Sequence, residues 1–240
     1  MKFMKGEHRI MYAKFVKRFL DFILSLFAII LLSPFLLILL ILGSIYMRGN
    51  PFFFQERPGK NEKVFRIIKF RSMNNKKDRN GNLLPDEVRL NKYGKFLRNT
   101  SLDELPELFN ILKGDMSIIG PRPLLVDYLP FYKPNEKIRY KMRPGLSGLA
   151  QVSGRNFLSW EEIFEYDIEY VNNVSFKLDV QILFKTVRRV AKKDSIADVS
   201  TLNIDEDGEL YVLVENKKKR LHKPLNIERR GMNNAKGNRK

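Results

Sequence analysis

The stretch that decides the fold is FILSLFAIILLSPFLLILLILGSIYM, which runs from Phe22 to Met47 without a charged residue. As one straight helix it would be about 39 Å long at about 1.5 Å per residue, compared with a hydrocarbon core of about 30 Å. The stretch therefore predicts a membrane segment. No small-residue cleavage site follows it, since Tyr46 and Met47 lead directly to Arg48, so we expect it to be retained and not removed as a signal peptide.

Two features of this segment bear on its topology. Ser33 and Pro34 lie near its centre, and an internal proline removes a backbone donor and bends a helix. Basic residues flank it on both sides, namely Lys2, Lys5, Arg9, Lys14, Lys17 and Arg18 before it and Arg48, Arg57, Lys60, Lys63, Arg66, Lys69 and Arg71 after it. Positive charge marks the cytoplasmic side. The pattern fits a re-entrant hairpin that breaks at Ser33-Pro34, and it equally fits a proline-kinked single span.

The composition excludes several kinds of chemistry. The chain has 240 residues, 44 Lys plus Arg, 27 Asp plus Glu, a formal charge of +17 and no cysteine. Disulfides, zinc-thiolate sites and thiol nucleophiles are therefore excluded. The two histidines, His8 and His222, lie near the ends and argue against a histidine base. The positive charge calls for an anionic partner: nucleic acid, anionic lipid or a phosphorylated substrate.

The rest of the chain predicts a small α+β domain. Apolar runs at 52–54 and 64–71 flank a Pro58-Gly59 turn and predict a short hairpin. Apolar residues at helical spacing predict amphipathic helices near 102–112, 160–171 and 176–189, which either pack on a core or lie on a membrane surface. The predicted organisation is a basic lead (1–20), a membrane anchor (21–47), a catalytic domain (48–194), a hairpin extension (195–215) and a basic, disordered tail (216–240).

Few residues remain that could carry chemistry. Neither GxxxxGK[ST] nor GxGxxG is present. Arg122 and Arg143 each lie in a Pro/Gly-rich loop, where a guanidinium suits phosphate oxygens, although for a motif taken alone a turn with a solvated Arg is the commoner explanation. Asp103-Glu104 fits a helix capping box that begins at Ser101. With cysteine absent and histidine confined to the ends, however, a carboxylate is also among the few available nucleophiles for phosphoryl chemistry, for which Mg²⁺ is the suitable cation.

Eight motifs follow one another in a fixed order along the chain. They are FFQERPG (53–59), KFRSM (69–73), RNTSLDELP (98–106), KGDMS (113–117), GPRPL (120–124), RPG (143–145), QVSGRN (151–156) and SFKLD (175–179). The series resembles the bacterial sugar transferase family, the monotopic polyprenyl-phosphate phosphoglycosyl transferases, over about residues 12–194. The chain is most similar to the short N,N′-diacetylbacillosaminyl-1-phosphate transferase type. In this family the Ser-Pro pair, here Ser33-Pro34, breaks a re-entrant membrane helix, so the resemblance implies a helix-break-helix anchor.

The resemblance implies a reaction and its residues. Asp103 would attack the sugar-bearing phosphorus of a UDP-sugar, release UMP and form a covalent phosphosugar-aspartate, which polyprenyl (undecaprenyl) phosphate then attacks. Glu104 would assist proton transfer or maintain the geometry, and Asp103 would contact Mg²⁺. The cations expected to bind phosphates are Lys69, Arg71, Arg98, Arg122, Arg143 and Arg155.

The same resemblance places the protein in the cell. It implies the cytoplasmic face of the bacterial plasma (inner) membrane, with the N-terminus and the catalytic domain both cytoplasmic. Expected partners are the UDP-sugar, polyprenyl phosphate, anionic membrane lipids and downstream glycosyltransferases of polysaccharide or glycoconjugate assembly, with no nucleic acid. The expected donor carries an N-acetylated deoxyamino sugar.

The sequence leaves three questions open. Leu149 replaces the Trp expected after the second Gly of the RPG loop, and Ser153 stands where Asn is common, so donor specificity is not fixed. A UDP-hexose donor is one alternative. Another is a membrane-tethered basic module without catalysis, which the charge alone would suit but which gives no reason for Asp103-Glu104 beside Arg98.

Overall fold

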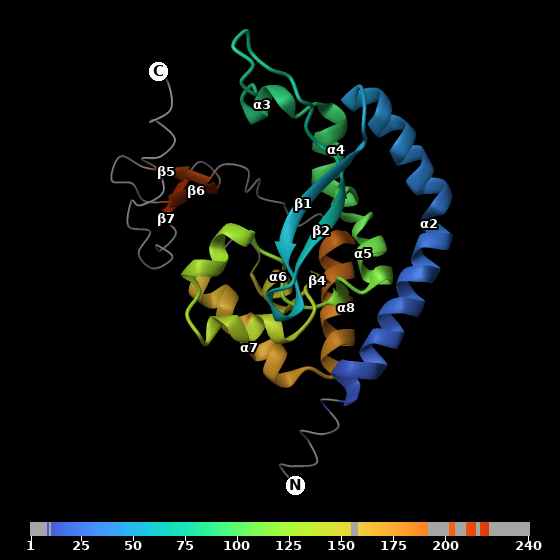
Figure 1. Ribbon diagram of the computed structural model, residues 1–240, viewed down its shortest axis with the longest axis vertical. Coiled ribbons are helices and arrows are strands. Elements are labelled where there is room, and N and C mark those ends of the chain that lie inside the picture. The colour runs from blue at the N-terminus through green and yellow to red at the C-terminus, as the bar shows by residue number, and fades with distance from the viewer. Residues whose placement is uncertain are drawn as a thin grey trace.

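A computed structural model describes Arg9 and residues 11–154, 158–191, 202–204, 210–214 and 217–220. Figure 1 shows a mixed α+β domain in which a β-hairpin lies between a long N-terminal helix and a group of shorter helices. The long helix consists of a π-helical turn, η1 (Tyr12–Val16), followed by α2 (Lys17–Met47). Together they form an apolar helix of 36 residues, long enough to cross a membrane.

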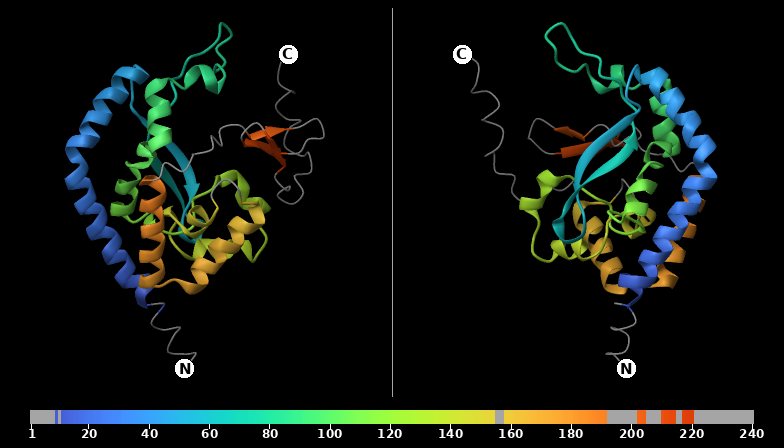
Figure 2. Two further views of the ribbon diagram at one scale, coloured as in Figure 1. Left: turned by 180° about the vertical axis from the view of Figure 1, so that it is seen from behind. Right: turned by 45° about the vertical axis from the view of Figure 1, so that its right-hand side comes forward.

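Helix α2 runs through Ser33-Pro34 without interruption, so the break predicted at this pair is absent from the structure. Pro34 has no N–H to donate to the carbonyl of Ile30, four residues earlier. The Ser33 hydroxyl donates to that same carbonyl at 2.8 Å. The serine therefore replaces the missing donor and the helix continues, curving along one side of the domain in both views of Figure 2.

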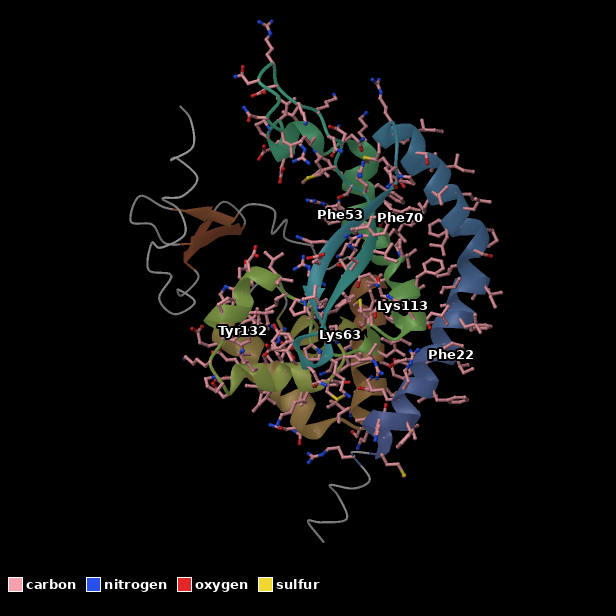
Figure 3. The ribbon with its side chains drawn as sticks, in the orientation of Figure 1. Phe22, Phe53, Lys63, Phe70, Lys113 and Tyr132 are labelled. Atoms are coloured by element: carbon pink, nitrogen blue, oxygen red, sulfur yellow. The ribbon has the colours of Figure 1, made fainter. Side chains whose placement is uncertain are left out.

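One face of α2 packs on the domain along most of its length. Leu36, Leu39 and Met47 form a buried cluster with residues of the hairpin and of α4 (Lys92–Thr100). Gly43 permits close approach, because a Cβ there would lie 2.9 Å from Pro51. The outer face exposes large apolar side chains, among them Phe22, which is labelled in Figure 3. The helix thus has a protein-facing side and an apolar side without protein cover.

The N-terminal part of the long helix is attached by buried polar contacts. Lys17 Nζ lies 2.7 Å from Asp179 Oδ2, and Tyr170 donates to the other oxygen of Asp179. Asp21 accepts hydrogen bonds from the Ser117 hydroxyl and a backbone N–H of the domain. These contacts join the start of the membrane helix to segments far along the chain.

The predicted hairpin is confirmed. Strand β1 (Phe52–Pro58) pairs antiparallel with β2 (Val64–Phe70), with Phe52 opposite Phe70. The turn contains η2 (Lys60–Glu62), where Asn61 adopts φ 55°. Asn110 of α5 (Glu107–Lys113) fixes the hairpin to that helix, because its amide donates to Arg66 O and accepts from Ile68 N.

The segment 102–112, predicted as one helix, is divided into two. A 3₁₀ turn, η3 (Leu102–Glu104), precedes α5, and Pro106 lies between them. Ser101 has φ 55° and its side chain makes no capping bond, so the capping-box explanation of Asp103-Glu104 is wrong. Gly114, which has φ 99°, ends α5.

The remaining elements complete the domain around a short parallel pair, β3 (Ser117–Ile119) and β4 (Gly145–Ser147). They are α3 (Asp86–Arg89), η4 (Val126–Phe131), η5 (Glu136–Lys141), α6 (Leu149–Ser153), α7 (Trp160–Asn173) and α8 (Phe176–Ala191). A capping box at Ser159 begins α7, which confirms the helix predicted near 160–171. In the C-terminal region, β5 (Leu202–Ile204), β6 (Leu210–Val214) and β7 (Lys217–Arg220) form an antiparallel sheet, with β7 in the segment predicted as a disordered tail.

Candidate active site

The Asp103-Glu104 pair lies on the 3₁₀ turn η3, between α4 and α5. The left-handed residue Ser101 ends α4 and turns the chain sharply. Leu102 and Leu105 then pack on the cluster that contains Leu36 and Leu39 of α2. The apolar residues of this turn therefore attach it to the cluster that includes α2, and the two carboxylates line a cavity.

This cavity has a volume of about 1250 Å³ and an apolar as well as a charged wall. The structure brings six of the predicted site residues together in its lining: Lys69, Arg71, Arg98, Asp103, Glu104 and Arg122. They come from β2, the residue after it, α4, η3 and the loop after β3. Segments more than 50 residues apart in sequence thus converge on one site.

Glu104 is the centre of an ion-pair network. Its Oε1 accepts hydrogen bonds from Lys69 Nζ and from a terminal nitrogen of Arg122, both at 2.8 Å. Burial alone would raise the pKa of Glu104, but Arg122 and Lys69 outweigh it and lower the pKa to about 2. Glu104 is therefore ionised at neutral pH and positions two cations.

Asp103 has the opposite electrostatic environment. Burial and the neighbouring charge of Glu104 raise the pKa of Asp103 to about 6, although Lys69, Arg122 and Arg98 act in the other direction. Two adjacent carboxylates thus have pKa values displaced in opposite directions by their surroundings, which is typical of groups with different chemical roles.

Glu107, one turn further along, is a third carboxylate of the network that the sequence reasoning missed. Its side chain is buried and lies 3.1 Å from Lys69 Nζ. Burial raises its pKa to about 7. A signal was available, because Glu107 follows Asp103 by four residues, but an acid in the first turn of a helix is ordinarily explained by the helix dipole.

Arg122 is positioned by a buried ion pair behind it. The backbone carbonyl of Arg122 accepts a hydrogen bond from Arg139, whose guanidinium lies 2.7 Å from Asp167. Both side chains of this pair are almost fully buried, with exposed fractions of 1% and 2%. The aromatic rings of Tyr132 and Phe164 pack against the Arg139 guanidinium.

Arg98 and Arg71 are less constrained. Arg98 Nε donates to the Ser72 hydroxyl at 3.0 Å. Within the described residues, the Arg71 side chain makes no hydrogen bond or ion pair, and it lines the cavity with its charge available to a ligand. Further lining residues that the sequence reasoning did not select are Phe53, Arg57, Ser72, Gln151 and Arg189.

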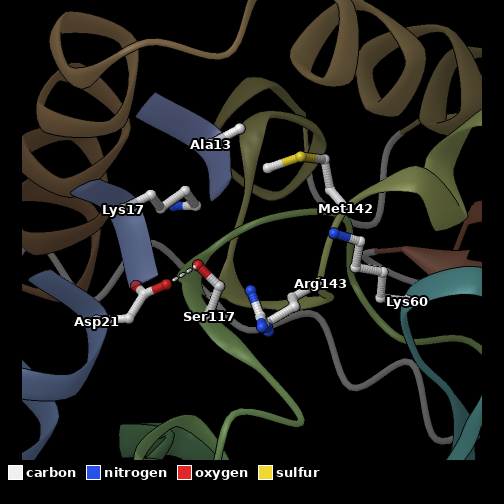
Figure 4. Close-up of a pocket in the computed structure, with 7 residues that line it drawn as sticks. All are labelled: Ala13, Lys17, Asp21, Lys60, Ser117, Met142 and Arg143. Atoms are coloured by element: carbon white, nitrogen blue, oxygen red, sulfur yellow. Dashed lines mark hydrogen bonds between the residues drawn. The ribbon is translucent and has the colours of Figure 1, made fainter. Parts of the chain in front are cut away.

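The other predicted site residues lie elsewhere. Arg143 does not line this cavity; it lines a small second cavity near the start of α2 (Figure 4). Arg155 falls outside the described residues. Ser33 and Pro34 lie within α2, where the Ser33 hydroxyl donates to the Ile30 carbonyl in place of the N–H that proline lacks.

The residues present fit a magnesium ion in one specific way. Across the described part of the chain, no three His, Asp or Glu side chains form a metal cluster. Mg²⁺, however, often uses one or two protein carboxylates and completes its shell with waters and substrate phosphates. Asp103 suits this arrangement, because it lines the cavity and, among the described residues, makes no ion pair.

A cavity that combines carboxylates with several cations suits a polyanionic ligand. The model of the bacterial sugar transferase family matches residues 12–193, and the chain belongs to this family.

Three relatives illustrate the range of the family. The chain is 46% identical over 181 residues to the uncharacterized sugar transferase EpsL of Bacillus subtilis, covering 75% of this chain and 90% of that protein. It is 39% identical to the UDP-N-acetylgalactosamine-undecaprenyl-phosphate N-acetylgalactosaminephosphotransferase of Aeromonas hydrophila, over 73% of this chain and 44% of the relative. It is 39% identical to the UDP-glucose:undecaprenyl-phosphate glucose-1-phosphate transferase of Klebsiella pneumoniae, over 71% and 39%. The chain thus spans less than half the length of these last two relatives.

Proposed function

We propose that this protein transfers a sugar 1-phosphate from a UDP-sugar to polyprenyl (undecaprenyl) phosphate, with release of UMP. The observation that carries the proposal is one cavity in which Asp103 lies among Lys69, Arg98 and Arg122, on a turn whose neighbours Leu102 and Leu105 pack on the cluster that contains Leu36 and Leu39 of the long apolar helix. The cations suit a diphosphate, and the adjacent apolar helix suits a lipid acceptor.

The reaction proceeds in two displacements. In the first, an ionised oxygen of Asp103 forms a bond to the sugar-bearing phosphorus of the UDP-sugar. The bond from this phosphorus to the bridging oxygen breaks, and UMP leaves with the electron pair. In the second, an oxygen of polyprenyl phosphate attacks the same phosphorus, the Asp103 carboxylate leaves, and the product is a polyprenyl diphosphate sugar.

The electrostatics support separate roles for the two carboxylates. Asp103, with a pKa near 6, is mostly ionised at neutral pH while keeping more basicity than an ordinary aspartate. Glu104 has a pKa near 2 and is too weak a base for proton transfer. Its role is to orient Lys69 and Arg122 toward the phosphate oxygens, which lowers the cost of arranging these charges during reaction.

Magnesium is the cofactor in this proposal, with Asp103 as its protein ligand. When bound, the ion would offset negative charge on the diphosphate. Arg71 and Arg98, which also line the cavity, supply further positive charge.

The donor sugar is the least constrained part of the proposal. An N-acetylated deoxyamino sugar is the donor expected from the sequence resemblance. A UDP-hexose is the second candidate, because the names of similarly related proteins include both an N-acetylhexosamine and glucose.

The membrane arrangement proposed is monotopic, with both ends of the long helix at the cytoplasmic face. Contacts at the two ends support it. Lys17 pairs with Asp179 near one end, and Tyr93 donates to Leu39 O and lies stacked on Tyr46 near the other. Because one domain contacts both ends, a helix that crossed the bilayer would have to separate from it.

The test is UMP release by the purified full chain with Mg²⁺, polyprenyl phosphate and a panel of UDP-sugars. Donor-dependent UMP release is expected, together with a covalent adduct on Asp103 when the acceptor is omitted. Asp103→Asn should abolish both. Substantial turnover by folded Asp103→Asn protein would refute the covalent step, and silence across the panel would contradict the proposed reaction.

A further inference from the structure

A second cavity lies at the N-terminal end of the membrane helix, away from Asp103. Its volume is only about 10 Å³, room for about one water molecule. Figure 4 shows its lining, which comes from η1, α2, the hairpin turn, β3 and the loop before β4: Ala13, Lys17, Asp21, Lys60, Ser117, Met142 and Arg143.

The charges around this cavity do not balance. Lys17 is neutralised by Asp179 at 2.7 Å. Both oxygens of Asp21 accept bonds from neutral donors of β3. Lys60 and Arg143 have no acidic partner within the described residues, and Arg143 only donates its Nε–H to a backbone carbonyl.

Neighbouring cations add to this excess. Partial burial, then the charges of Arg143 and Lys14, lower the pKa of Lys60. Burial, then the charge of Arg18, lowers the pKa of Arg143. Arg143 and Lys14 therefore repel Lys60, and Arg18 repels Arg143 although Asp21 acts in the other direction, so a bound anion would relieve the repulsion that remains.

The cluster lies at a defined depth relative to the membrane. Lys14 and Arg18 shortly precede the uncharged run that begins at Phe22, and the Arg18 guanidinium also donates to the carbonyls of Ile111 and Leu112. Phe15 and Phe19, on the same turns, are largely exposed. A change from basic and aromatic residues to purely apolar ones marks the headgroup level of a bilayer.

We infer that Lys60 and Arg143, supported by Lys14 and Arg18, form a binding site for the phosphate of an anionic phospholipid headgroup. In this inference Arg143, which lies outside the catalytic cavity, binds a lipid phosphate. It also fixes the base of the membrane helix at the headgroup layer. The inference concerns lipid binding and does not depend on the transfer reaction.

The experiment counts retained lipid on the full chain. The protein is reconstituted into nanodiscs of equal parts phosphatidylcholine and phosphatidylglycerol, released into mild detergent, and analysed by native mass spectrometry. The test variant is Lys60→Gln/Arg143→Gln. The matched control is Arg66→Gln/Arg79→Gln, which removes the same charge from exposed positions on the hairpin and on the loop after it.

Wild type and control should retain phosphatidylglycerol in preference to phosphatidylcholine. The test variant should bind phosphatidylglycerol about tenfold to thirtyfold more weakly, as expected for the loss of two basic residues at a membrane surface. Lys60→Gln alone provides a variant that should fold normally, because Lys60 is exposed and makes no side-chain hydrogen bond within the described residues. It should lose about fivefold.

Equal retention by test and control variants would overturn the inference, as would equal retention of the two lipids by wild type. A third arm adds inorganic phosphate as a competitor. Displacement of lipid only at high phosphate concentration supports a headgroup site. Tight phosphate binding that depends on Lys60, without preference for the anionic lipid, would assign the site to a soluble anion and refute the lipid.

Discussion

The Arg139–Asp167 ion pair gives the sharpest test of how the scaffold positions the catalytic cavity. The two groups lie 2.7 Å apart with side-chain exposed fractions of 1% and 2%, and Arg139 also donates to the backbone carbonyl of Arg122. Asp167→Asn removes the negative charge and leaves the Arg139 guanidinium buried without a counter-charge. Breaking a buried pair in this way costs about 3–5 kcal/mol.

The assay is thermal unfolding of the full chain in one detergent. For a protein of this size about 1 kcal/mol corresponds to about 2–4 °C in Tm, so the expected decrease is about 6–20 °C. The matched control is Glu56→Gln, which breaks the exposed pair with Arg66 at 3.9 Å, where the exposed fractions are 76% and 63%. Such surface pairs contribute about 0–1 kcal/mol, and the control should shift Tm by less than about 4 °C.

A double variant distinguishes the cost of leaving Arg139 without a counter-charge from a general disruption of core packing. Asp167→Leu/Arg139→Met replaces both charges with apolar groups, and it should recover a large part of the stability lost by Asp167→Asn. Its UMP release should nevertheless stay below wild type, because the bond to the Arg122 carbonyl is gone. A Tm shift for Asp167→Asn no larger than that of Glu56→Gln would refute this account of the pair.

Three further predictions follow from the geometry. Asp103 must be ionised to attack, and its pKa is near 6. The rate of covalent-adduct formation should therefore fall about tenfold per pH unit below pH 6 and be constant above it. Single-turnover UMP release from pH 5 to 8 measures this rate, and a rate that does not change over this range would contradict the prediction. Ser33→Ala should lower the free energy of unfolding by about 0.5–1.5 kcal/mol, because the Ile30 carbonyl loses its donor. In a Pro34→Ala background a backbone N–H is restored, and Ser33→Ala should then have little effect. Equal losses in both backgrounds would show that the Ser33 hydroxyl does not replace the missing N–H. Gly94→Ala should strongly destabilise the protein and abolish transfer, because its Cβ would lie 1.8 Å from the Ser72 carbonyl oxygen; a wild-type Tm would contradict that contact.

Local patterns predicted much of this fold. The Pro58-Gly59 turn between two apolar runs predicted the observed hairpin, and the helical spacing near 160–171 predicted α7, which begins at the Ser159 capping box. Both features depend on residues close together in sequence, where turn and cap rules operate. The absence of the helix break predicted at Pro34 also has a local cause, because the neighbouring Ser33 hydroxyl donates to the carbonyl that proline leaves without a donor.

The site was predictable in its residue types and less so in its connections. Asp103, Glu104 and four of the six selected cations share the cavity. The network around them depends on contacts between residues that are far apart in sequence. Lys69 and Glu104 are 35 positions apart, and Ser117 and Asp21 are 96 positions apart. Sequence spacing carries no direct signal for such contacts, which explains why the sequence did not reveal Glu107, the Arg139–Asp167 pair or the separate cavity that Arg143 lines.

The packing of η3 on the membrane helix connects the two halves of the proposed reaction. Leu102 and Leu105 flank the carboxylate pair and pack on the cluster that contains Leu36 and Leu39, while the other face of α2 exposes apolar side chains. The nucleophile is therefore separated from the proposed hydrocarbon layer by one helix. In the proposed reaction the soluble donor and the lipid phosphate both have to reach this carboxylate. A separate headgroup site at Lys60 and Arg143 would keep the N-terminal end of this helix at the membrane surface while the acceptor exchanges. Membrane anchoring and catalysis would then use different cations.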